Sequence, residues 1–565
     1  MKVLVLDSAS SGATAAIQDL GKIGAKIHAI ALAPHHDLGS RYVSHRFAPQ
    51  RDPTPDVYGC RLEELQEAEA YDLIIPSSEI SLRAIQALGA GHPLRPRAVL
   101  ASHESVEITL DKTRTHKLAT RLDLPVPTAK IIQRDRPSEA TMSYPLVLKP
   151  VISQVLVDGV YQYAQPTVIR DDAEYEWFLE RWLPHTQVEE HNFVEGNGWG
   201  VGCLYDHGEL LWHFTHERVH EWPLTGGASS YRRSVRTPDH LLEISRQLLD
   251  ALEWHGIAMV EFRVHQQTGL ATLMEINPRP WGSMPLAFRS GVHFPRGLLT
   301  LASGRRPSPQ GSYRTDLFMR SLQKDAEWMR ANWMADQSDP LTLTRPRVTS
   351  LLEWLRVLGR TEEWDHFSWR DPEPGMRQIA MLFREFIKMC QNRATGLIEA
   401  AGLRRLHRAN LDRWRSTPEA HDNIHFICFG NICRSPYAAH AASARNESWS
   451  ASSSGLHATP GRESPDRIQR LASANGVDLS SHRARTLHDT DIAAATLLVV
   501  MDPNNLSDLL ARFPQAREKV VLLGLLADQP QLSVPDPISL DHNGITLAFG
   551  LIEDAVSQLS SLKQP

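Results

Sequence analysis

Short apolar runs alternate with amphipathic stretches along most of the chain, a pattern typical of α/β proteins. Near the N-terminus, the runs at 2–7, 26–32 and 72–78 each predict a buried parallel strand. The first run leads into a turn at 8–12 and a helix to Leu20. Residues 1–100 are therefore expected to form a doubly wound α/β unit. Its first turn, S-A-S-S-G, contains too little glycine for a dinucleotide fingerprint, so we interpret it as a packing turn.

Farther along, charged residues lie inside strand-like apolar runs. Glu261 is in IAMVEFRV, and Glu275 is in ATLMEINPRP. A carboxylate in such a run is costly to bury unless it is paired or binds a metal. Mg²⁺ prefers hard oxygen ligands, which both carboxylates and the amide of Asn277 could supply. The two strands therefore predict a divalent metal site. Arg279 follows closely and could contact a phosphoryl group or form a salt bridge.

Length and composition limit the number of domains and the class of protein, but they do not identify a substrate. Its 565 residues are too many for one core and indicate three or four domains. Hydrophobic content of 42%, charged content of 22% and a net charge of −6 predict a soluble globular protein with no nucleic-acid or membrane partner. The five scattered cysteines suggest no disulfide framework, and no apolar run reaches membrane length. We expect a cytoplasmic protein, with a homodimer left open.

The sequence C-F-G-N-I-C-R-S, residues 428–435, lies between an apolar strand-like run and a helix-like PYAAHAASA segment. A tight turn into a helix N-terminus surrounds a small space with backbone N–H groups, which attract an anion. The same helix end favours the thiolate of Cys428, which makes it a nucleophile near neutral pH. Arg434 supplies a planar fork for two phosphoryl oxygens, and Ser435 can donate to the leaving thiolate.

This stretch closely resembles the low-molecular-weight protein tyrosine phosphatases, whose signature is C-x-G-N-x-C-R-S. The resemblance continues through SSSGLHATPG, GVDLSSHRARTL, TLLVVMD and a final D-P, and implies a Rossmann-like phosphatase domain with a central parallel sheet over 420–565. It implies that Cys428 attacks phosphorus while Arg434 binds the phosphoryl oxygens. Asn431 and Ser453 would hold the loop in shape, and Asp536 would protonate the leaving oxygen and then activate water.

Two positions depart from the pattern of this family. Ile538 follows the D-P of the general acid, where relatives often have an aromatic residue. Ala458 similarly occupies a position of the pocket rim that is aromatic in many relatives. Phosphate monoester hydrolysis is expected, because its machinery is complete, whereas preference for phosphotyrosine stays open.

Residues 101–306 resemble the ATP-grasp superfamily of carboxylate–amine ligases. The evidence is the helix-like segment with Lys112 that runs into V-P, the strand YPLVLKP with Lys149, and the metal-binding run E-I-N-P-R. The resemblance implies that both lysines bind the phosphates of ATP. It assigns Mg²⁺, with Mn²⁺ as an alternative, to Glu261, Glu275 and Asn277.

The same resemblance suggests further nucleotide contacts. Arg218 precedes a T-G-G loop and is a candidate phosphate ligand, although a surface hairpin is the alternative interpretation. The adenine hinge is expected in VEEHNFVEGNGWGV, with Glu190, His191 and Asn192 as its candidate residues. Arg279 would reach the γ-phosphate or an acyl phosphate. The segment 151–165, where a glycine-rich flap is expected, contains one glycine, which weakens any prediction of tight closure.

Residues 307–419 contain no catalytic motif and are interpreted as a helical connector that ends in a long helix from 376 to 415. We expect a bifunctional enzyme acting on small-molecule carboxylate, amine and phosphate monoester substrates in a biosynthetic pathway. One alternative is a regulatory phosphatase acting on a phosphotyrosine protein, for instance in polysaccharide export. Another is a grasp module that binds or senses ATP without ligation. No acceptor is identified by these motifs.

Overall fold

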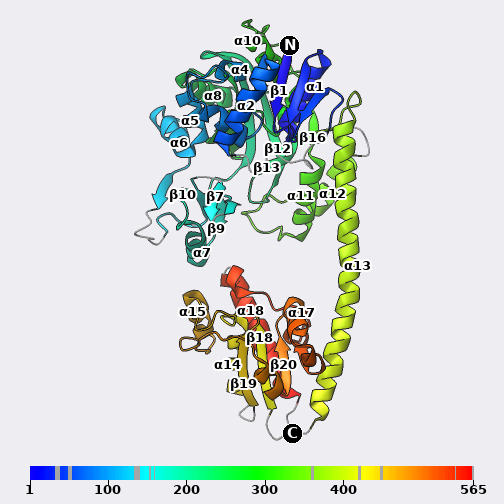
Figure 1. Ribbon diagram of the computed structural model, residues 1–565. Coiled ribbons are helices and arrows are strands. Elements are labelled where there is room, and N and C mark those ends of the chain that lie inside the picture. The colour runs from blue at the N-terminus through cyan, green and yellow to red at the C-terminus, as the bar shows by residue number, and fades with distance from the viewer. Residues whose placement is uncertain are drawn as a thin grey trace. The chain divides into compact units, whose positions relative to one another are not determined.

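The computed structural model describes residues 1–31, 39–48, 54–132, 140–151, 154–157, 160–357, 362–417, 422–445, 449–540 and 542–562. The chain divides into two compact units, Met1–Glu385 and Phe386–Pro565 (Figure 1). Among the described residues, no helix combines the length and the apolar character needed to span a bilayer. The α/β class expected from the sequence is confirmed in both units.

The first unit begins with a parallel sheet in the order β3-β2-β1-β4. Its strands are β1 (Lys2–Leu6), β2 (Lys26–Ile30), β3 (Val43–Phe47) and β4 (Leu73–Ile75). The accompanying helices are α1 (Ser11–Lys22), α2 (Pro55–Glu69), α3 (Glu79–Ala87) and α4 (Arg95–Ala98). Val3 and Val5 pack with α1, whereas Leu4 and Leu6 pack with α2. Both faces of the sheet are therefore covered by helices, as in a doubly wound fold.

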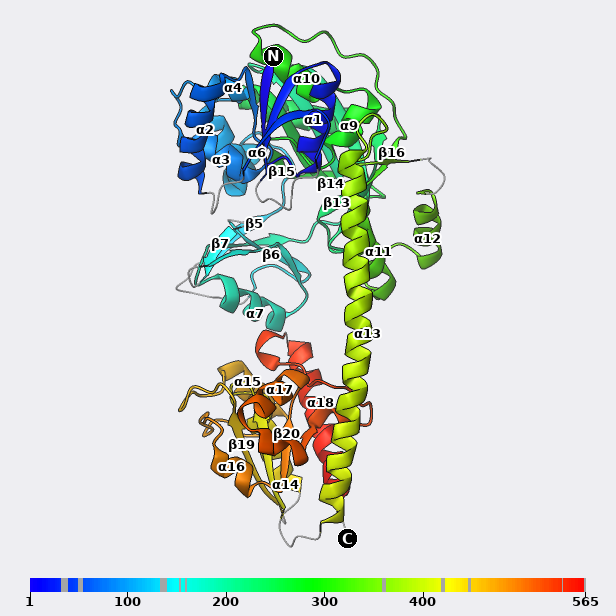
Figure 2. The ribbon, with the colours of Figure 1, turned by 45° about the vertical axis from the view of Figure 1, so that its right-hand side comes forward.

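A small antiparallel sheet follows in the order β5-β10-β6-β9, with a separate hairpin beside it in the chain (Figure 2). Its strands are β5 (Ala129–Ile132), β6 (Leu146–Pro150), β9 (Thr167–Ile169) and β10 (Val188–Asn192), and the hairpin is β7 (Gln154–Val157) and β8 (Val160–Tyr163). The helices of this region are α5 (His103–Leu110), α6 (Lys112–Arg121) and α7 (Asp172–Trp182). Residues 152–153 and 158–159 of the expected flap, including its glycine, lie outside the described residues.

A seven-stranded sheet in the order β15-β14-β11-β12-β13-β16-β17 completes the first unit. Its strands are β11 (Asn197–Asp206), β12 (Glu209–Trp222), β13 (Ala228–Val235), β14 (Gly256–Val264), β15 (Ala271–Asn277), β16 (Phe318–Arg320) and β17 (Glu363–Trp364). The helices are α8 (Asp239–Ala251), α9 (Met284–Ser290), α10 (Phe294–Ala302), α11 (Leu322–Met334) and α12 (Arg347–Leu355). Strands β16 and β17 extend this sheet. The part of the expected helical connector around them therefore belongs to the first unit.

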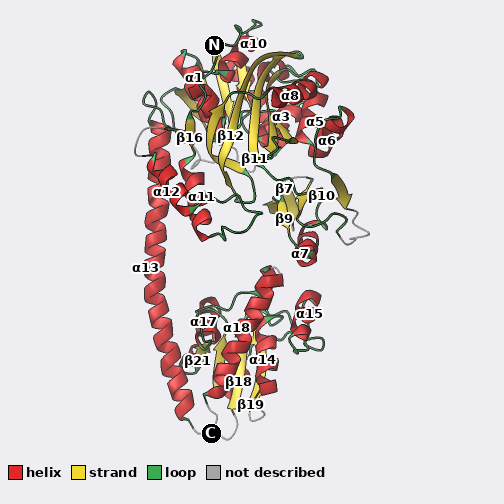
Figure 3. Cartoon of the chain, turned by 180° about the vertical axis from the view of Figure 1, so that it is seen from behind, coloured by secondary structure: helices red, strands yellow, loops and turns green. Residues whose placement is uncertain are grey.

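The second unit has a parallel sheet in the order β19-β18-β20-β21 (Figure 3). Its strands are β18 (Asp422–Cys428), β19 (Trp449–Gly455), β20 (Leu497–Val500) and β21 (Val520–Leu522). The helices are α14 (Arg434–Arg445), α15 (Asp466–Ala474), α16 (Asp489–Ala494), α17 (Pro503–Arg512) and α18 (His542–Ser561). Phe426 packs in one buried cluster and Ile427 in another, so apolar clusters cover both faces of the sheet.

The long helix α13 (Glu373–Ser416) contributes residues to both units. Its C-terminal part is anchored in the phosphatase-like unit. Trp414 packs beside Trp449, and the Asn410 side chain donates to the Arg517 and Val520 carbonyls, each at 2.8 Å. The sequence predicted this helix over 376–415. In the structure it begins three residues earlier and ends one residue later.

Candidate active sites

The loop after β18 brings the predicted phosphatase residues together. Cys428 is the last residue of β18, and Arg434 is the first residue of α14. The Cys428 Sγ lies 3.0 Å from the Ser435 hydroxyl and accepts a hydrogen bond from the Asn431 N–H at 3.2 Å. The sulfur of the candidate nucleophile is therefore held by the main chain and a side chain of its own loop.

Asn431 fixes the shape of this loop. Its φ is 53°, in the left-handed region that asparagine tolerates better than most residues. The side-chain amide donates to Ser435 at 3.0 Å and to Ser453 at 2.9 Å. Its oxygen accepts from the Arg485 N–H at 2.9 Å. Asn431 and Ser453, which the sequence predicted to hold the loop in shape, are in contact. The additional hydrogen bond from the Arg485 main chain was not predicted.

The Arg434 guanidinium is buried and held by two carboxylates. One nitrogen lies 2.7 Å from Asp502, and the other lies 2.7 Å from Asp536. The expected acid, far away in sequence, therefore lies at the same loop as the nucleophile. Asp502 was not predicted, although it ends the strand-like run TLLVVMD and caps α17.

An exposed aromatic side chain close in sequence to Cys428 is provided by Phe429, a position that was not predicted from the sequence. Phe429, directly after the nucleophile, is 53% exposed and stacks on His457 with ring centroids 4.6 Å apart. Ile538, which replaces the aromatic residue expected after D-P, is 42% exposed. Its carbonyl accepts a hydrogen bond from Arg467. An exposed aromatic side chain therefore directly follows the nucleophile in sequence, although Ile538 and Ala458 are not aromatic.

A second candidate site is a cavity of about 750 Å³ in the first unit. Its wall includes the turn after β1, the start of α6, the strands β6 and β10, the loop after β12, and the facing strands β14 and β15. Most predicted nucleotide and metal residues line it: Lys112, Lys149, His191, Asn192, Arg218, Glu261, Glu275, Asn277 and Arg279.

The three predicted metal ligands form one cluster in this cavity. Glu261 and Glu275 are direct partners across β14 and β15. The Asn277 side-chain nitrogen lies 3.0 Å from an oxygen of each carboxylate. Two carboxylates and an amide on adjacent strands fit the oxygen-rich ligand set of Mg²⁺. Cations neutralise them here, since Lys112 lies 2.8 Å from Glu275 and Arg218 pairs with Glu261.

The two carboxylates differ in proton affinity. Lys112 holds the pKa of Glu275 well below its usual range. Burial raises the pKa of Glu261, although the adjacent Arg218 opposes this change. A divalent cation between them would favour the charged form of both groups.

Lys149 lies in β6 opposite Glu189 of β10. Burial, followed by repulsion from Lys112, lowers the pKa of Lys149 to about 7. Burial alone would raise the pKa of Glu189, but hydrogen bonds from His191 and Thr113 outweigh it and lower the pKa to about 2. The cavity therefore contains a lysine whose charge depends on what it binds near neutral pH.

The three hinge candidates of β10 differ in their contacts. His191 and Asn192 line the cavity. Glu190 does not line it, and instead accepts hydrogen bonds from the main-chain N–H groups of Thr141 at 2.9 Å and Met142 at 2.6 Å. The structure thus gives Glu190 a structural contact rather than a place at the nucleotide.

The two candidate arginines reach the cavity from different elements, Arg218 from β12 and Arg279 from the segment after β15. Arg218 donates to the Gly227 carbonyl at 2.8 Å, which ties it to the T-G-G loop. Gly226 has a φ of 107°, and a side chain there would collide with Arg263. Arg279 also lines the cavity and donates to the Pro280 carbonyl at 3.2 Å. Arg218 therefore contacts the carboxylate cluster through Glu261, whereas Arg279 is placed on the cavity wall.

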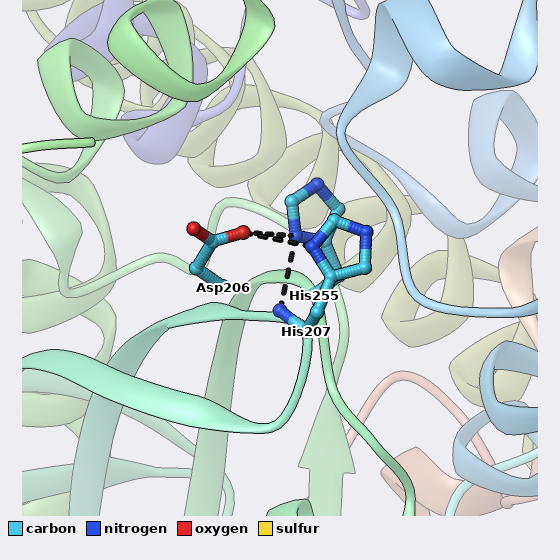
Figure 4. Close-up of side chains that lie close together, drawn as sticks. All are labelled: Asp206, His207 and His255. Atoms are coloured by element: carbon cyan, nitrogen blue, oxygen red, sulfur yellow. Dashed lines mark hydrogen bonds and ion pairs between the residues drawn. The ribbon is translucent and has the colours of Figure 1, made fainter. Parts of the chain in front are cut away.

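Asp206, His207 and His255 form a separate cluster at the turn between β11 and β12 (Figure 4). The Asp206 carboxylate lies 2.8 Å from the Nδ1 of His207 and 3.4 Å from the Nδ1 of His255. The two imidazole rings are close to parallel, with centroids 4.0 Å apart and planes inclined by 31°. Hydrogen bonding and ring stacking account for this arrangement, so we assign no metal to it.

The parallel sheet and its C-x-G-N-x-C-R-S loop define the class of the second unit as low-molecular-weight phosphatases. Residues 423–564 match the family model described as low molecular weight phosphotyrosine protein phosphatase. A protein of Klebsiella pneumoniae assigned to these phosphatases is 30% identical over 132 residues, which cover 23% of this chain and 90% of that protein. The chain belongs to this family through its C-terminal part.

Residues 191–324 match the model described as ATP-grasp in the biosynthetic pathway with Ter operon. Part of the first unit therefore matches an ATP-grasp family model, and both resemblances stated from the sequence are confirmed.

Solved structures that are similar to parts of this chain include the following two. A biotin carboxylase from Campylobacter jejuni has a TM-score of 0.44 and 12% identity, over 56% of this chain and 74% of that one. The Erwinia amylovora tyrosine phosphatase AmsI has a TM-score of 0.24 and 26% identity, over 25% of this chain and 92% of that one.

Proposed function

We propose that the chain is a bifunctional enzyme. The first unit would join a carboxylate to an amine at the expense of ATP, and the second would hydrolyse a phosphate monoester. The observation that carries the first activity is the convergence of Lys112, Lys149, Glu261, Glu275 and Asn277 on one cavity. The second activity is supported by the contacts of Cys428 with its loop and of Arg434 with Asp536.

Ligation needs activation because a carboxylate oxygen is a poor leaving group at neutral pH. Transfer of the γ-phosphoryl group of ATP to this oxygen would give an acyl phosphate, ADP would leave, and amine attack would then release phosphate. Lys112 and Lys149 would hold the nucleotide phosphates, and Arg279 and Arg218 would stabilise the transferring group. Mg²⁺ held by Glu261, Glu275 and Asn277 would supply charge neutralisation on the phosphates.

Phosphate ester hydrolysis would proceed through sulfur. The Cys428 thiolate would attack phosphorus while Arg434 binds two equatorial oxygens. Binding of these oxygens would replace the present Arg434 contact with Asp536, and the Asp536 carboxyl could then protonate the leaving oxygen. In the second step the Asp536 carboxylate would accept a proton from water as it attacks phosphorus, and Ser435 would donate to the departing thiolate.

A regulatory phosphatase acting on phosphotyrosine is the second candidate. The observation that favours it is the exposed Phe429, stacked on His457 beside the nucleophile. The relatives of this unit also include the protein named low molecular weight protein-tyrosine-phosphatase Wzb of Salmonella typhi. In this case the first unit would bind or sense ATP and would not catalyse ligation.

One experiment tests the proposal and separates the candidates. ADP release from the full chain is measured with Mg²⁺ATP and a panel of carboxylates and amines, and must require one member of each class. Phosphate release is then compared between phosphotyrosyl peptides and small phosphate esters. ATP binding without acceptor-dependent turnover across the panel would favour the regulatory alternative.

We expect Phe429→Ala to weaken aryl phosphate hydrolysis selectively. Loss of the exposed aromatic ring should raise the KM for p-nitrophenyl phosphate by about 2- to 10-fold, which corresponds to one aromatic contact. The KM for a short alkyl phosphate should stay unchanged. Phe383→Ala, which removes an exposed phenylalanine from the other unit, serves as the matched control. An equal loss with both substrates would mean that Phe429 supports the loop rather than the substrate.

Binding of Mg²⁺ATP should take up protons above neutral pH. Lys149, with its pKa near 7, is largely neutral at pH 8, and adjacent phosphates favour its ammonium form. Calorimetry in buffers of different ionisation enthalpy should show uptake approaching one proton at pH 8 and much less at pH 6. Lys149→Met should abolish the uptake, and Lys130→Met, which alters an exposed lysine, should keep it. Equal uptake at both pH values would contradict this assignment.

A further inference from the structure

Part of the ATP-grasp cavity is formed by the chain after residue 307, where the sequence showed no catalytic motif. Ser321, Gln323 and Lys324, at the start of α11, line this part together with Asp365, His366 and Gln378. Residues from the opposite end of the unit, Ser10 and Ser11, line the same cavity. These groups differ from those assigned to the nucleotide and metal, so they are available to another substrate.

This wall is held in place by a polar network. Arg232 pairs with one oxygen of Asp365, and the Ser11 hydroxyl donates to the other at 3.2 Å. The His366 Nδ1 lies 3.1 Å from the Thr14 hydroxyl. Since these side chains are satisfied by each other, they shape the cavity and leave no net charge there. Burial also lowers the pKa of His366, which keeps the imidazole neutral.

Lys324 differs from its neighbours because its ammonium group is free. Within the described part of the chain, no ion pair or hydrogen bond of its side chain is found. The Lys324 side chain is exposed and lines the cavity. Partial burial of the ammonium group lowers the pKa of Lys324. The carboxylates of Asp365 and Glu327 oppose this change, whereas Arg232 and Arg218 add to it.

Two other cations of the cavity are already paired, Arg218 with Glu261 and Lys112 with Glu275. The proposed function assigns Lys149 and Arg279, which also line the cavity, to the phosphates of ATP, and this leaves Lys324 for another substrate. Lys324 also lies in the first turn of α11, whose cap residue Ser321 makes no side-chain hydrogen bond to that turn. The helix end and the ammonium group therefore present positive charge to the same part of the cavity.

We propose that the carboxylate substrate of the ligase carries a second anionic group, a carboxylate or a phosphate, which binds to Lys324. This inference rests on the proposed ligase activity and specifies its substrate class. Lys324 is then a residue for substrate binding and selectivity, remote from the reacting carboxylate. A phosphate in this position would also make the substrate or product of the ligase a candidate for the phosphatase of the same chain.

The test measures binding and needs no turnover. Full-length protein with Mg²⁺ and a non-hydrolysable ATP analogue is titrated with sets of compounds of equal chain length. Each set contains a monocarboxylate, a dicarboxylate and a phosphonocarboxylate with the same number of chain atoms, for example butyrate, succinate and 3-phosphonopropionate, and the sets span chain lengths of three to six atoms. The phosphonate arm resists the phosphatase and distinguishes phosphate from carboxylate as the second anion.

We expect at least one dianion to bind about 10- to 100-fold more tightly than its monoanion, as for one charge-assisted contact. Lys324→Gln should remove this preference. Arg330→Gln, which removes an exposed positive charge from the same helix, should retain it. The preference should also survive in Lys324→Arg.

Two results would overturn the inference: no preference for any dianion in the wild-type protein, or an equal preference in Lys324→Gln. Thermal unfolding of each variant establishes that the unit remains folded. Absence of ADP release with a bound dianion and amines would count against ligation, while the binding result would stand by itself. The two proposals therefore fail on different measurements.

Discussion

Replacing Cys428 by serine is expected to abolish hydrolysis of p-nitrophenyl phosphate, with a loss of at least about 10⁴-fold in kcat. A serine hydroxyl stays protonated at neutral pH, and the loop contains no adjacent base to activate it. The groups within hydrogen-bond distance of the sulfur are the Asn431 N–H and the Ser435 hydroxyl, and neither is basic enough to deprotonate an alcohol. ADP release by the other unit should be unaffected.

Cys60→Ser is the matched control for this variant. Cys60 is an exposed free cysteine in α2 of the other unit, and its replacement should leave phosphate release unchanged. Asp536→Ala should slow the reaction of alkyl phosphates more than that of p-nitrophenyl phosphate, whose leaving group needs less protonation. A Cys428→Ser protein that retains the wild-type rate would exclude Cys428 as the nucleophile.

The phosphatase site could be predicted well because most of it is contiguous. Residues 428–435 are held by a strand, a turn and a helix, so their spacing alone places sulfur, guanidinium and hydroxyl around one anion. Asp536 required the resemblance, because nothing local connects it to the loop. Asp502 and the Phe429–His457 stack were missed, since they depend on contacts between residues distant in sequence.

In the first unit, the predicted residues are far apart in sequence, and only some of them line the cavity. Glu261 and Glu275 could be identified because charges inside apolar strands are rare and costly, and the structure brings them face to face. Glu190 shows where sequence proximity is insufficient, because its carboxylate accepts hydrogen bonds from the main-chain N–H groups of Thr141 and Met142 and does not line the cavity.

The connector was misjudged for a physical reason. Strands β16 and β17 contain three and two residues, too few to give a periodic signal. They nevertheless join the seven-stranded sheet and bring Lys324 and Asp365 to the cavity wall. Sequence patterns therefore predicted candidate phosphate and metal residues, whereas the remaining wall of the cavity could be identified only from the folded chain.

The second large effect is expected for Glu275→Gln, which should reduce acceptor-dependent ADP release by at least about 100-fold. The substitution keeps the size of the side chain but removes one of two carboxylates from the cluster with Asn277. It also leaves Lys112 without the partner that now lies 2.8 Å away. Mn²⁺ affinity, measured by electron paramagnetic resonance with a bound ATP analogue, should fall in parallel.

Glu180→Gln provides the matched control, since Glu180 is exposed at the end of α7 and does not line the cavity. Phosphate release from p-nitrophenyl phosphate in the same preparation reports whether the other unit remains intact. Thermal unfolding separates loss of the metal site from loss of the fold. Wild-type ADP release with unchanged Mn²⁺ affinity in Glu275→Gln would show that the facing carboxylates of β14 and β15 are not metal ligands. In that case their pairing with Lys112 and Arg218 would be purely structural.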